Sequence, residues 1–248
     1  MFFYGESDTG LVRRENQDSF VFSEINEDYF LAAVLDGMGG LSSGSIASSL
    51  AKEKLAQYLS DGLKQLKNDH PSDHEMQNLI SDAVAYTSHE VYMCSLKSPE
   101  HKSMGTTLAA ILKSPRKTYI FHVGDSRVYA LASGRLHLLT TDHTFVQYLI
   151  DTKQITPSDA ETHPQRHVLT KAIGTEDFAS PDISVMSSSK AKCFLLCSDG
   201  LTLHLSDSEI EGILSEDLPP REKVGRFIKI AKERGAYDNI TVLIVANT

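Results

Sequence analysis

The sequence lacks a long hydrophobic run, since no apolar stretch approaches the ~20 residues that a membrane-spanning helix needs. The first ten residues, MFFYGESDTG, do not place a basic segment before an apolar core, so they do not read as a signal peptide. An excess of positive charge is also missing, because the formal net charge is −9. These absences argue against a membrane segment in this chain and against a nucleic-acid partner, which usually meets a basic face.

Cysteine is scarce as well. Only Cys94, Cys193 and Cys197 are present, and no two of them form a CxxC pair. An odd number of cysteines without metal-binding spacing indicates reduced thiols and a cytoplasmic location. Cys193 and Cys197 stand four apart in CFLLC, so in a strand they would share one face, and we expect them to be small core residues.

Several well-known motifs are missing. The chain has no EF-hand loop, no P-loop and no HExxH, and the Gly37/Gly39 pair lacks the last glycine of GxGxxG because Ser42 stands there. Low-complexity segments and internal repeats are also absent. The 248 residues suffice for one sizeable core, and we expect a single domain over 1–248.

The apolar pattern predicts two kinds of secondary structure. Short β-rich runs bounded by Gly, Asn, Asp or Ser predict strands at 19–22, 29–35, 106–112, 118–123, 127–132, 136–140, 183–186, 193–197 and 240–245. Apolar residues three to four apart predict helices at 45–67 and 73–96, with shorter ones near 143–151, 206–215 and 220–234.

The order of these elements indicates the fold class. Strands come in hairpin-like groups, with turn signals NED at 26–28 and SGR at 133–135, and helical pairs lie between the groups. This order predicts an α+β fold with mostly antiparallel sheets and not a βαβ repeat. The segment 141–182 is the least regular part and holds three X-Pro pairs, so we expect a flap there.

Five aspartates stand where an apolar run begins or ends: Asp18, Asp36, Asp125, Asp199 and Asp238. Each alone has an ordinary explanation, because Asp-Gly pairs and aspartates at strand ends are common turn signals. If the strands lie side by side, however, the carboxylates gather at one edge and repel one another unless cations sit among them. Oxygen ligands suit Mg²⁺ or Mn²⁺. Glycine leaves room for close approach, so the carbonyl of Gly37 is a further candidate ligand.

Two arginines suggest a substrate. Arg13 and Arg14 stand shortly before Asp18, and arginine binds phosphate oxygens bidentately. An arginine beside cation-binding carboxylates therefore points to a phosphoryl substrate. The alternative is a surface salt bridge to Glu15 or to another carboxylate.

Eight motifs in this order resemble the protein phosphatase 2C family, the metal-dependent serine/threonine protein phosphatases. They are VRRENQDS (12–19), VLDGMGG (34–40), GTTLAA (105–110), HVGDSR (122–127), TTDHTFVQYL (140–149), THPQRHVLTKAIG (162–174), LLCSDGL (195–201) and YDNITV (237–242). The match spans nearly the whole chain, and DGMGG with HPQRH is similar to the bacterial branch.

The resemblance implies a four-layer α/β/β/α sandwich with two Mn²⁺ or Mg²⁺ ions at one end of the central sheets. It implies that Asp36 bridges the two ions and that the Gly37 carbonyl binds one of them. Asp199 and Asp238 would complete the other, and Asp18 would lie close by and act through water.

The same resemblance assigns further roles. Arg13 would hold the substrate phosphate, and Asp125 would join Asp199 around a third, weaker ion. In the flap, the residue after the HPQR run would reach that ion. The flap candidates are His163, Arg166 and His167, and His167 stands where a serine is more usual.

The activity implied is hydrolysis of phosphoserine and phosphothreonine by metal-activated water, opposing a serine/threonine kinase. The oligomeric state stays open, with a monomer as our default expectation. Eukaryotic members carry His where this chain has Met38, which cannot donate a proton to the leaving alkoxide. Water on the third ion is our hypothesis for the donor. Two other functions stay open: a non-catalytic binding module with this fold, and a hydrolase of small phosphate esters or of an anti-sigma-type phosphoprotein.

Overall fold

The computed structural model describes residues 2–40, 42–66 and 71–247. Its strands are β1 (Phe2–Asp8), β2 (Asp18–Glu24), β3 (Phe30–Met38), β4 (Gly105–Thr106), β5 (Leu108–Lys113), β6 (Lys117–Val123), β7 (Arg127–Ala132), β8 (Arg135–Leu138), β9 (Asp182–Ser187), β10 (Cys193–Cys197) and β11 (Ile240–Ala246). Its α-helices are α1 (Ser43–Gln65), α2 (Asp73–Ser95), α3 (Phe145–Asp151), α4 (Pro157–Glu161), α5 (Asp199–Thr202), α6 (Asp207–Ser215) and α7 (Pro220–Glu233), with short 3₁₀ turns at Pro99–His101 and Ser188–Lys190.

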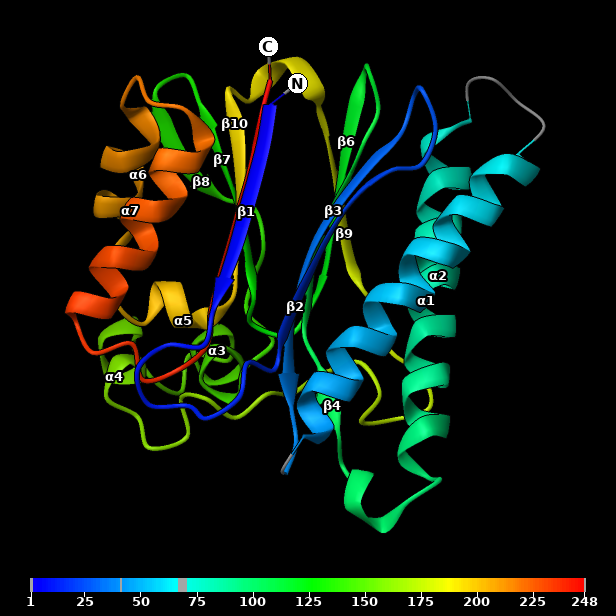
Figure 1. The fold of residues 1–248 in the computed structure, drawn as a ribbon, viewed down its shortest axis with the longest axis horizontal. Coiled ribbons are helices and arrows are strands. Elements are labelled where there is room, and N and C mark those ends of the chain that lie inside the picture. Colours follow the sequence, from blue (N-terminus) through cyan, green and yellow to red (C-terminus); the bar gives the residue numbers. More distant parts are fainter. Residues whose placement is uncertain (1, 41, 67–70, 248) are drawn as a thin grey trace.

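The strands form two sheets that pack face to face. One sheet has the order β1-β11-β10-β7-β8, and the other has the order β2-β3-β5-β6-β9 with β4 paired to β3. Helices α1 and α2 cover the second sheet, while α6 and α7 cover the first (Figure 1). The paired strands are antiparallel, so the predicted α+β class and the four-layer α/β/β/α sandwich are confirmed.

Strand β3 shows why the sequence folds into layers. Its residues FLAAVL are buried on both faces. Leu31, Ala33 and Leu35 pack toward α1 and α2, while the residues between them join the core between the two sheets. Because successive side chains of a strand point to opposite faces, an uninterrupted apolar run is what a strand between two layers requires.

Local signals set the helix boundaries. Helix α2 begins with a capping box in which Ser72 and Glu75 satisfy each other's backbone N–H groups, and α6 begins with the same arrangement from Ser206 and Glu209. Helix α7 has Pro220 at its first position, where no N–H is needed. These signals account for the accuracy of the predicted boundaries at 73, 206 and 220.

The predicted strands and helices all form, with differences at several ends and some elements that were not predicted. Helices α4 and α5 were not predicted, and β8 ends at Leu138 instead of 140. The run predicted at 106–112 divides into β4 and β5, and β3 continues to Met38 instead of ending at 35 because β4 pairs with its last residues. Strand β1 was not predicted; its Phe2 and Phe3 are exposed at the edge of a sheet, so it carries no buried apolar pattern. The end of the helix predicted at 45–67 falls at residue 67, outside the described residues.

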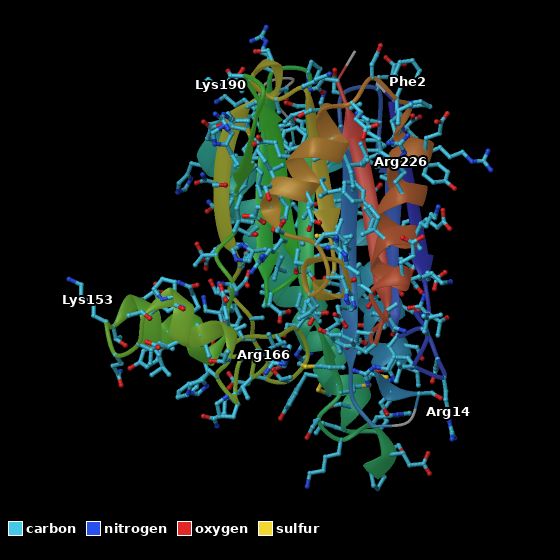
Figure 2. All side chains as sticks on the ribbon, turned by 90° about the vertical axis from the view of Figure 1, so that its left-hand side faces the viewer. Phe2, Arg14, Lys153, Arg166, Lys190 and Arg226 are labelled. Atoms are coloured by element: carbon cyan, nitrogen blue, oxygen red, sulfur yellow. The ribbon has the colours of Figure 1, made fainter. Side chains whose placement is uncertain are left out.

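The flap segment 141–182 holds α3 and α4 and projects from the body of the protein, with Lys153 at its tip (Figure 2). A backbone bridge between Thr106 and Ile173 ties its inner part to β4, and a second bridge, between Thr144 and Leu169, joins two parts of the flap itself. The inner part of the flap therefore lies against the end of the sheet that carries β4.

Two further expectations can be compared with the structure. Cys193 and Cys197 are buried as free thiols in the core beneath α6 and α7, which confirms their expected place. Within the described ranges, no helix combines the length and the apolar character required to cross a bilayer.

Candidate active site

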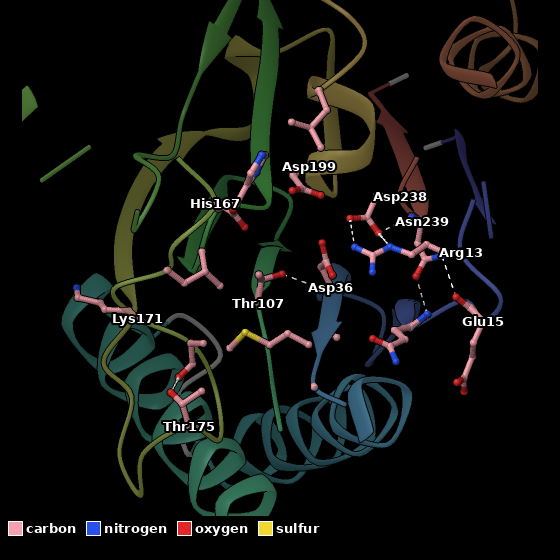
Figure 3. A pocket seen from close by; sticks show the side chains of 18 of the residues that line it. Arg13, Glu15, Asp36, Thr107, His167, Lys171, Thr175, Asp199, Asp238 and Asn239 are labelled. Atoms are coloured by element: carbon pink, nitrogen blue, oxygen red, sulfur yellow. Dashed lines mark hydrogen bonds and ion pairs between the residues drawn. The ribbon is translucent and has the colours of Figure 1, made fainter. Parts of the chain in front are cut away.

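A pocket of about 1120 Å³ opens at the end of the two sheets that lies away from the chain termini. The loops after β3, β6 and β10 and the loop before β11 converge there. Seven of the predicted site residues line it: Arg13, Asp36, Gly37, Asp125, His167, Asp199 and Asp238. Figure 3 shows the carboxylates of Asp36, Asp199 and Asp238 turned toward a common space.

Asp18 lies beside the pocket lining. It pairs with Asp36 in the register of β2 and β3, which places the two carboxylates at the same strand end. The hydroxyl groups of Thr241 and Ser198 donate to its Oδ2 at 2.6 and 2.8 Å. Removal from water nevertheless raises the pKa of Asp18 to about 6.

Asp36 lies at the centre of the acidic group. Its backbone is fixed from one side, because its N–H donates to Thr107 Oγ1 at 3.0 Å and its carbonyl accepts from the Thr107 N–H at 2.8 Å. Burial raises the pKa of the Asp36 carboxyl well above its usual range, and the charges of Asp18 and Asp199 raise it further.

Asp125 and Asp199 share this environment. Burial, followed by the charge of Asp142, raises the pKa of Asp125 to about 6. Burial, followed by the charges of Asp125 and Asp238, raises the pKa of Asp199 well above its ordinary value. Four half-buried carboxyl groups, those of Asp36, Asp125, Asp199 and Asp238, thus line one pocket with Asp18 beside them. The charges of their neighbours disfavour the ionisation of Asp36, Asp125 and Asp199.

Two glycines allow the backbone to close around these carboxylates. A Cβ on Gly37 would lie 2.1 Å from the carbonyl oxygen of Gly44, and a Cβ on Gly200 would lie 1.9 Å from that of Asn239. Both distances are far below any real contact. The Asp-Gly pairs at 36–37 and 199–200 are therefore not hairpin turns; each glycine lets a second segment pack directly against the aspartate that precedes it.

Arg13 approaches the acidic group from the loop between β1 and β2. Its Nε donates to Asp238 Oδ1 at 2.9 Å and its Nη2 to Asp238 Oδ2 at 2.7 Å, and this hydrogen bonding raises the arginine pKa. Of the two alternatives, the structure shows a salt bridge, but its partner is a predicted metal ligand and not Glu15. The guanidinium is more than half exposed and lines the pocket.

The predicted flap residues divide into two groups. His167 lines the pocket and lies near Asp199 (Figure 3). Burial, with the nearby charge of Arg166, lowers the pKa of His167. His163 packs against Phe145 with the ring centres 6.2 Å apart, and neither it nor Arg166 belongs to the pocket lining.

One group of possible ligands was not predicted from the sequence, in which no cluster of His and Cys ligands is clear. His122, His143 and Asp182 place three possible ligand atoms within 4.8 Å of one another, at the root of the flap. His122 and His143 stand inside the motifs HVGDSR and TTDHT, but no spacing signal joins them to Asp182, which is 39 residues beyond His143. Only the pairing of β6 with β9 brings them together.

The acidic group has the properties of a site for divalent cations. All its donors are oxygens, and within the described part of the chain the buried Oδ1 atoms of Asp18 and Asp199 have no hydrogen-bond partner. A buried carboxylate oxygen without a donor is costly, and a cation removes that cost together with the mutual repulsion. The residues therefore fit hard divalent ions such as Mg²⁺ and Mn²⁺.

Comparisons with known proteins show the family to which the chain belongs. A family model described as Protein phosphatase 2C matches residues 12–239. The chain is 34% identical to the serine/threonine phosphatase stp of Listeria monocytogenes over 96% of this chain and 93% of that protein, and 32% identical to the protein phosphatase PhpP of Streptococcus pneumoniae over 97% and 95%. The crystal structure of the serine/threonine phosphatase Stp1 from Staphylococcus aureus superposes with a TM-score of 0.89 at 30% identity, covering 99% of this chain and 94% of that one. The chain therefore belongs to the protein phosphatase 2C family and is a phosphoprotein phosphatase of the bacterial type.

Proposed function

We propose that this chain hydrolyses phosphoserine and phosphothreonine in proteins with two Mn²⁺ or Mg²⁺ ions held by Asp36, the Gly37 carbonyl, Asp199 and Asp238. Asp18 lies beside these residues and acts on the ions through water. A third ion binds more weakly at Asp125. The observation that carries this proposal is the convergence of four half-buried carboxyl groups on one pocket, with Asp18 beside them and two buried oxygens unpaired among the described residues. Bound cations would supply hydroxide at neutral pH and would neutralise phosphate charge.

The chain's own residues orient the substrate. Arg13 is one of two arginines that line the pocket, and a guanidinium can hold two phosphate oxygens at once. It lies beside the predicted ligand Asp238, and its exposed guanidinium can turn from Asp238 to a phosphate at the pocket mouth. Thr107 fixes the backbone of Asp36 by two hydrogen bonds, so this carboxylate is held before substrate arrives.

The leaving alkoxide needs a proton, and Met38 at the pocket wall has none to give. The His167 imidazole, whose pKa is lowered, is mostly neutral at neutral pH and so lacks the extra proton that a general acid must give. We therefore assign proton delivery to water held at Asp125.

The test compares peptides that carry phosphoserine, phosphothreonine or phosphotyrosine with a small ester such as glycerol phosphate, all in Mn²⁺. Turnover of the phosphoserine and phosphothreonine peptides at least tenfold above the small ester supports a protein substrate. Preference for the small ester favours the alternative hydrolase. Opposition to a serine/threonine kinase, a monomeric state and a cytoplasmic location remain predictions, and phosphopeptide mapping after deletion of such a kinase would test the first.

A further inference from the structure

The root of the flap is joined to the Asp125 turn by the ion pair of Arg127 with Asp142 and by the hydrogen bonds of His143. His143 lies just before α3 and is only 8% exposed. Its backbone N–H donates to the carbonyl of Gly124 at 2.9 Å, and the N–H of Gly124 donates back to the His143 ring at Nδ1, at 3.1 Å. Two hydrogen bonds thus tie His143 to the residue that immediately precedes Asp125.

These hydrogen bonds fix the position of the imidazole proton. A backbone N–H can only donate, so Nδ1 must offer its lone pair and the neutral ring carries its proton on Nε2. Burial lowers the pKa of His143, which favours the neutral ring. Nε2 faces Asp182 Oδ2 at 3.4 Å, and the other oxygen of Asp182 lies 3.2 Å from Nζ of Lys171.

The same tautomer argues against a metal ion bound by His122, His143 and Asp182. A metal on Nε2 of His143 would need the ring proton on Nδ1, where it would point at the N–H of Gly124. Two donors would then face each other. The ring accepts from Gly124 at Nδ1, and its Nε2 lies 3.4 Å from Asp182 without a hydrogen bond among the described residues. The stacked ring of His122, 4.5 Å away, donates from Nε2 to the Thr141 carbonyl.

The Asp125 turn needs support from both sides. Gly124 has φ +103°, and a Cβ there would lie 2.7 Å from a methyl group of Thr107, so the turn is tight and strained for other residues. On one side, Ser126 Oγ lies 2.6 Å from Thr107 Oγ1, the atom that also accepts from the Asp36 N–H. On the other side, His143 forms two hydrogen bonds with Gly124.

His143 also holds the part of the flap that lines the pocket. Its carbonyl accepts from the N–H of Thr170 at 2.9 Å, and Thr170 and Lys171 both line the pocket. We infer that His143 is a positioning residue for Asp125: its Nδ1 holds the Gly124 peptide, and its backbone links that peptide to the flap stretch 170–171. This inference rests on the proposed function, because it gives Asp125 a part in cation binding.

The test uses two amides that imitate different ring nitrogens. In His143→Asn the amide oxygen can occupy the place of Nδ1 and accept from Gly124, whereas in His143→Gln the amide reaches the place of Nε2 and leaves Gly124 without an acceptor. Calorimetric titration with Mn²⁺ measures the weakest class of bound ion. We expect His143→Asn to stay within about twofold of wild type and His143→Gln to bind that ion about three- to tenfold more weakly, the size of one buried hydrogen bond.

Two further variants guard against a general loss of folding. Asp182→Asn changes a half-exposed residue, so it should fold, and we expect a smaller loss of Mn²⁺ affinity in the same direction. In an Asp125→Ala background, His143→Gln should cause no further loss. Equal affinities for the Asn and Gln variants, or an added loss in the Asp125→Ala background, would overturn the inference. A wild type without any Mn²⁺ response would contradict the proposed function itself, so the two failures are distinguishable.

Discussion

The guanidinium of Arg13 holds both carboxylate oxygens of Asp238, at 2.9 and 2.7 Å, although the two residues are 225 positions apart. The pair joins the residue proposed to bind phosphate to a residue proposed to bind a cation. A carboxylate that is fully engaged by an arginine offers fewer lone pairs to a metal ion. Cation loading at Asp238 and release of Arg13 toward phosphate should therefore be linked.

The first prediction concerns this link. Arg13→Ala should lower kcat/KM for a phosphothreonine peptide by about 10- to 100-fold, because a bidentate charge-assisted hydrogen bond to phosphate is lost. The same change frees Asp238, so the Mn²⁺ concentration at half-saturation should fall. Arg14→Ala is the matched control, since Arg14 lines the same pocket and has no ion pair within the described residues. Equal effects of the two substitutions would contradict the role of Arg13.

The second prediction concerns the free energy of unfolding, which the mutual repulsion of the acidic residues lowers when no cation is bound. In chelator-treated protein, Asp36→Asn removes one of several charges that repel one another, so the melting temperature should rise by a few degrees, which corresponds to about 1 kcal/mol for a chain of this size. Addition of Mn²⁺ should stabilise wild type and leave the variant unchanged. Asp28→Asn, on an exposed turn, should show the wild-type response to both treatments. A Mn²⁺ response that survives in Asp36→Asn would place the cation elsewhere.

The third prediction separates proton delivery from cation binding. Asp125→Ala should slow the hydrolysis of a phosphoserine peptide far more than that of an aryl phosphate, because an aryl leaving group departs without a proton. Steady-state kcat values for both substrates, at saturating Mn²⁺, provide the measurement. Equal losses on the two substrates would show that Asp125 has no part in proton delivery.

The fourth prediction tests the close approach at the second Asp-Gly pair. Gly200→Ala places a methyl group where the Asn239 carbonyl lies, so we expect a loss of at least about 1–3 kcal/mol in the free energy of unfolding. Gly212→Ala is the matched control in α6, where a Cβ meets nothing within 4 Å and the change should stabilise by about 0.5–1 kcal/mol. Urea denaturation measures both. Similar stabilities for the two variants would show that Gly200 is an ordinary turn residue.

Most of the helices and strands could be predicted from local sequence signals. Capping residues such as Ser72 and Ser206 mark helix starts, and buried strands such as β3 and β10 show continuous apolar runs, so their existence could be read from short windows. Strand β1 could not be read in this way. It is an edge strand, and the contacts of Phe3 with Phe22 and Phe30 lie in parts of the sequence distant from it.

Seven residues of the pocket lining could be predicted from the sequence, but the contacts between them could not. The position of Asp36 at a strand end and the spacing of Arg13 before Asp18 are visible in the sequence. The ion pair of Arg13 with Asp238 and the hydrogen bonds between His143 and Gly124 depend on how distant segments meet. Such contacts are fixed by strand order and register, which no short window contains.

The most direct test of the account is the hydrolysis of a phosphothreonine peptide by chelator-treated protein, before and after Mn²⁺ is restored, for wild type and Asp36→Asn. We predict no turnover without the cation, full turnover of wild type once it is restored, and a loss of at least about a hundredfold in the variant, because the carboxylate at the centre of the acidic group is gone. Turnover that persists in the chelator, or a variant as active as wild type, would contradict a metal-dependent reaction centred on Asp36.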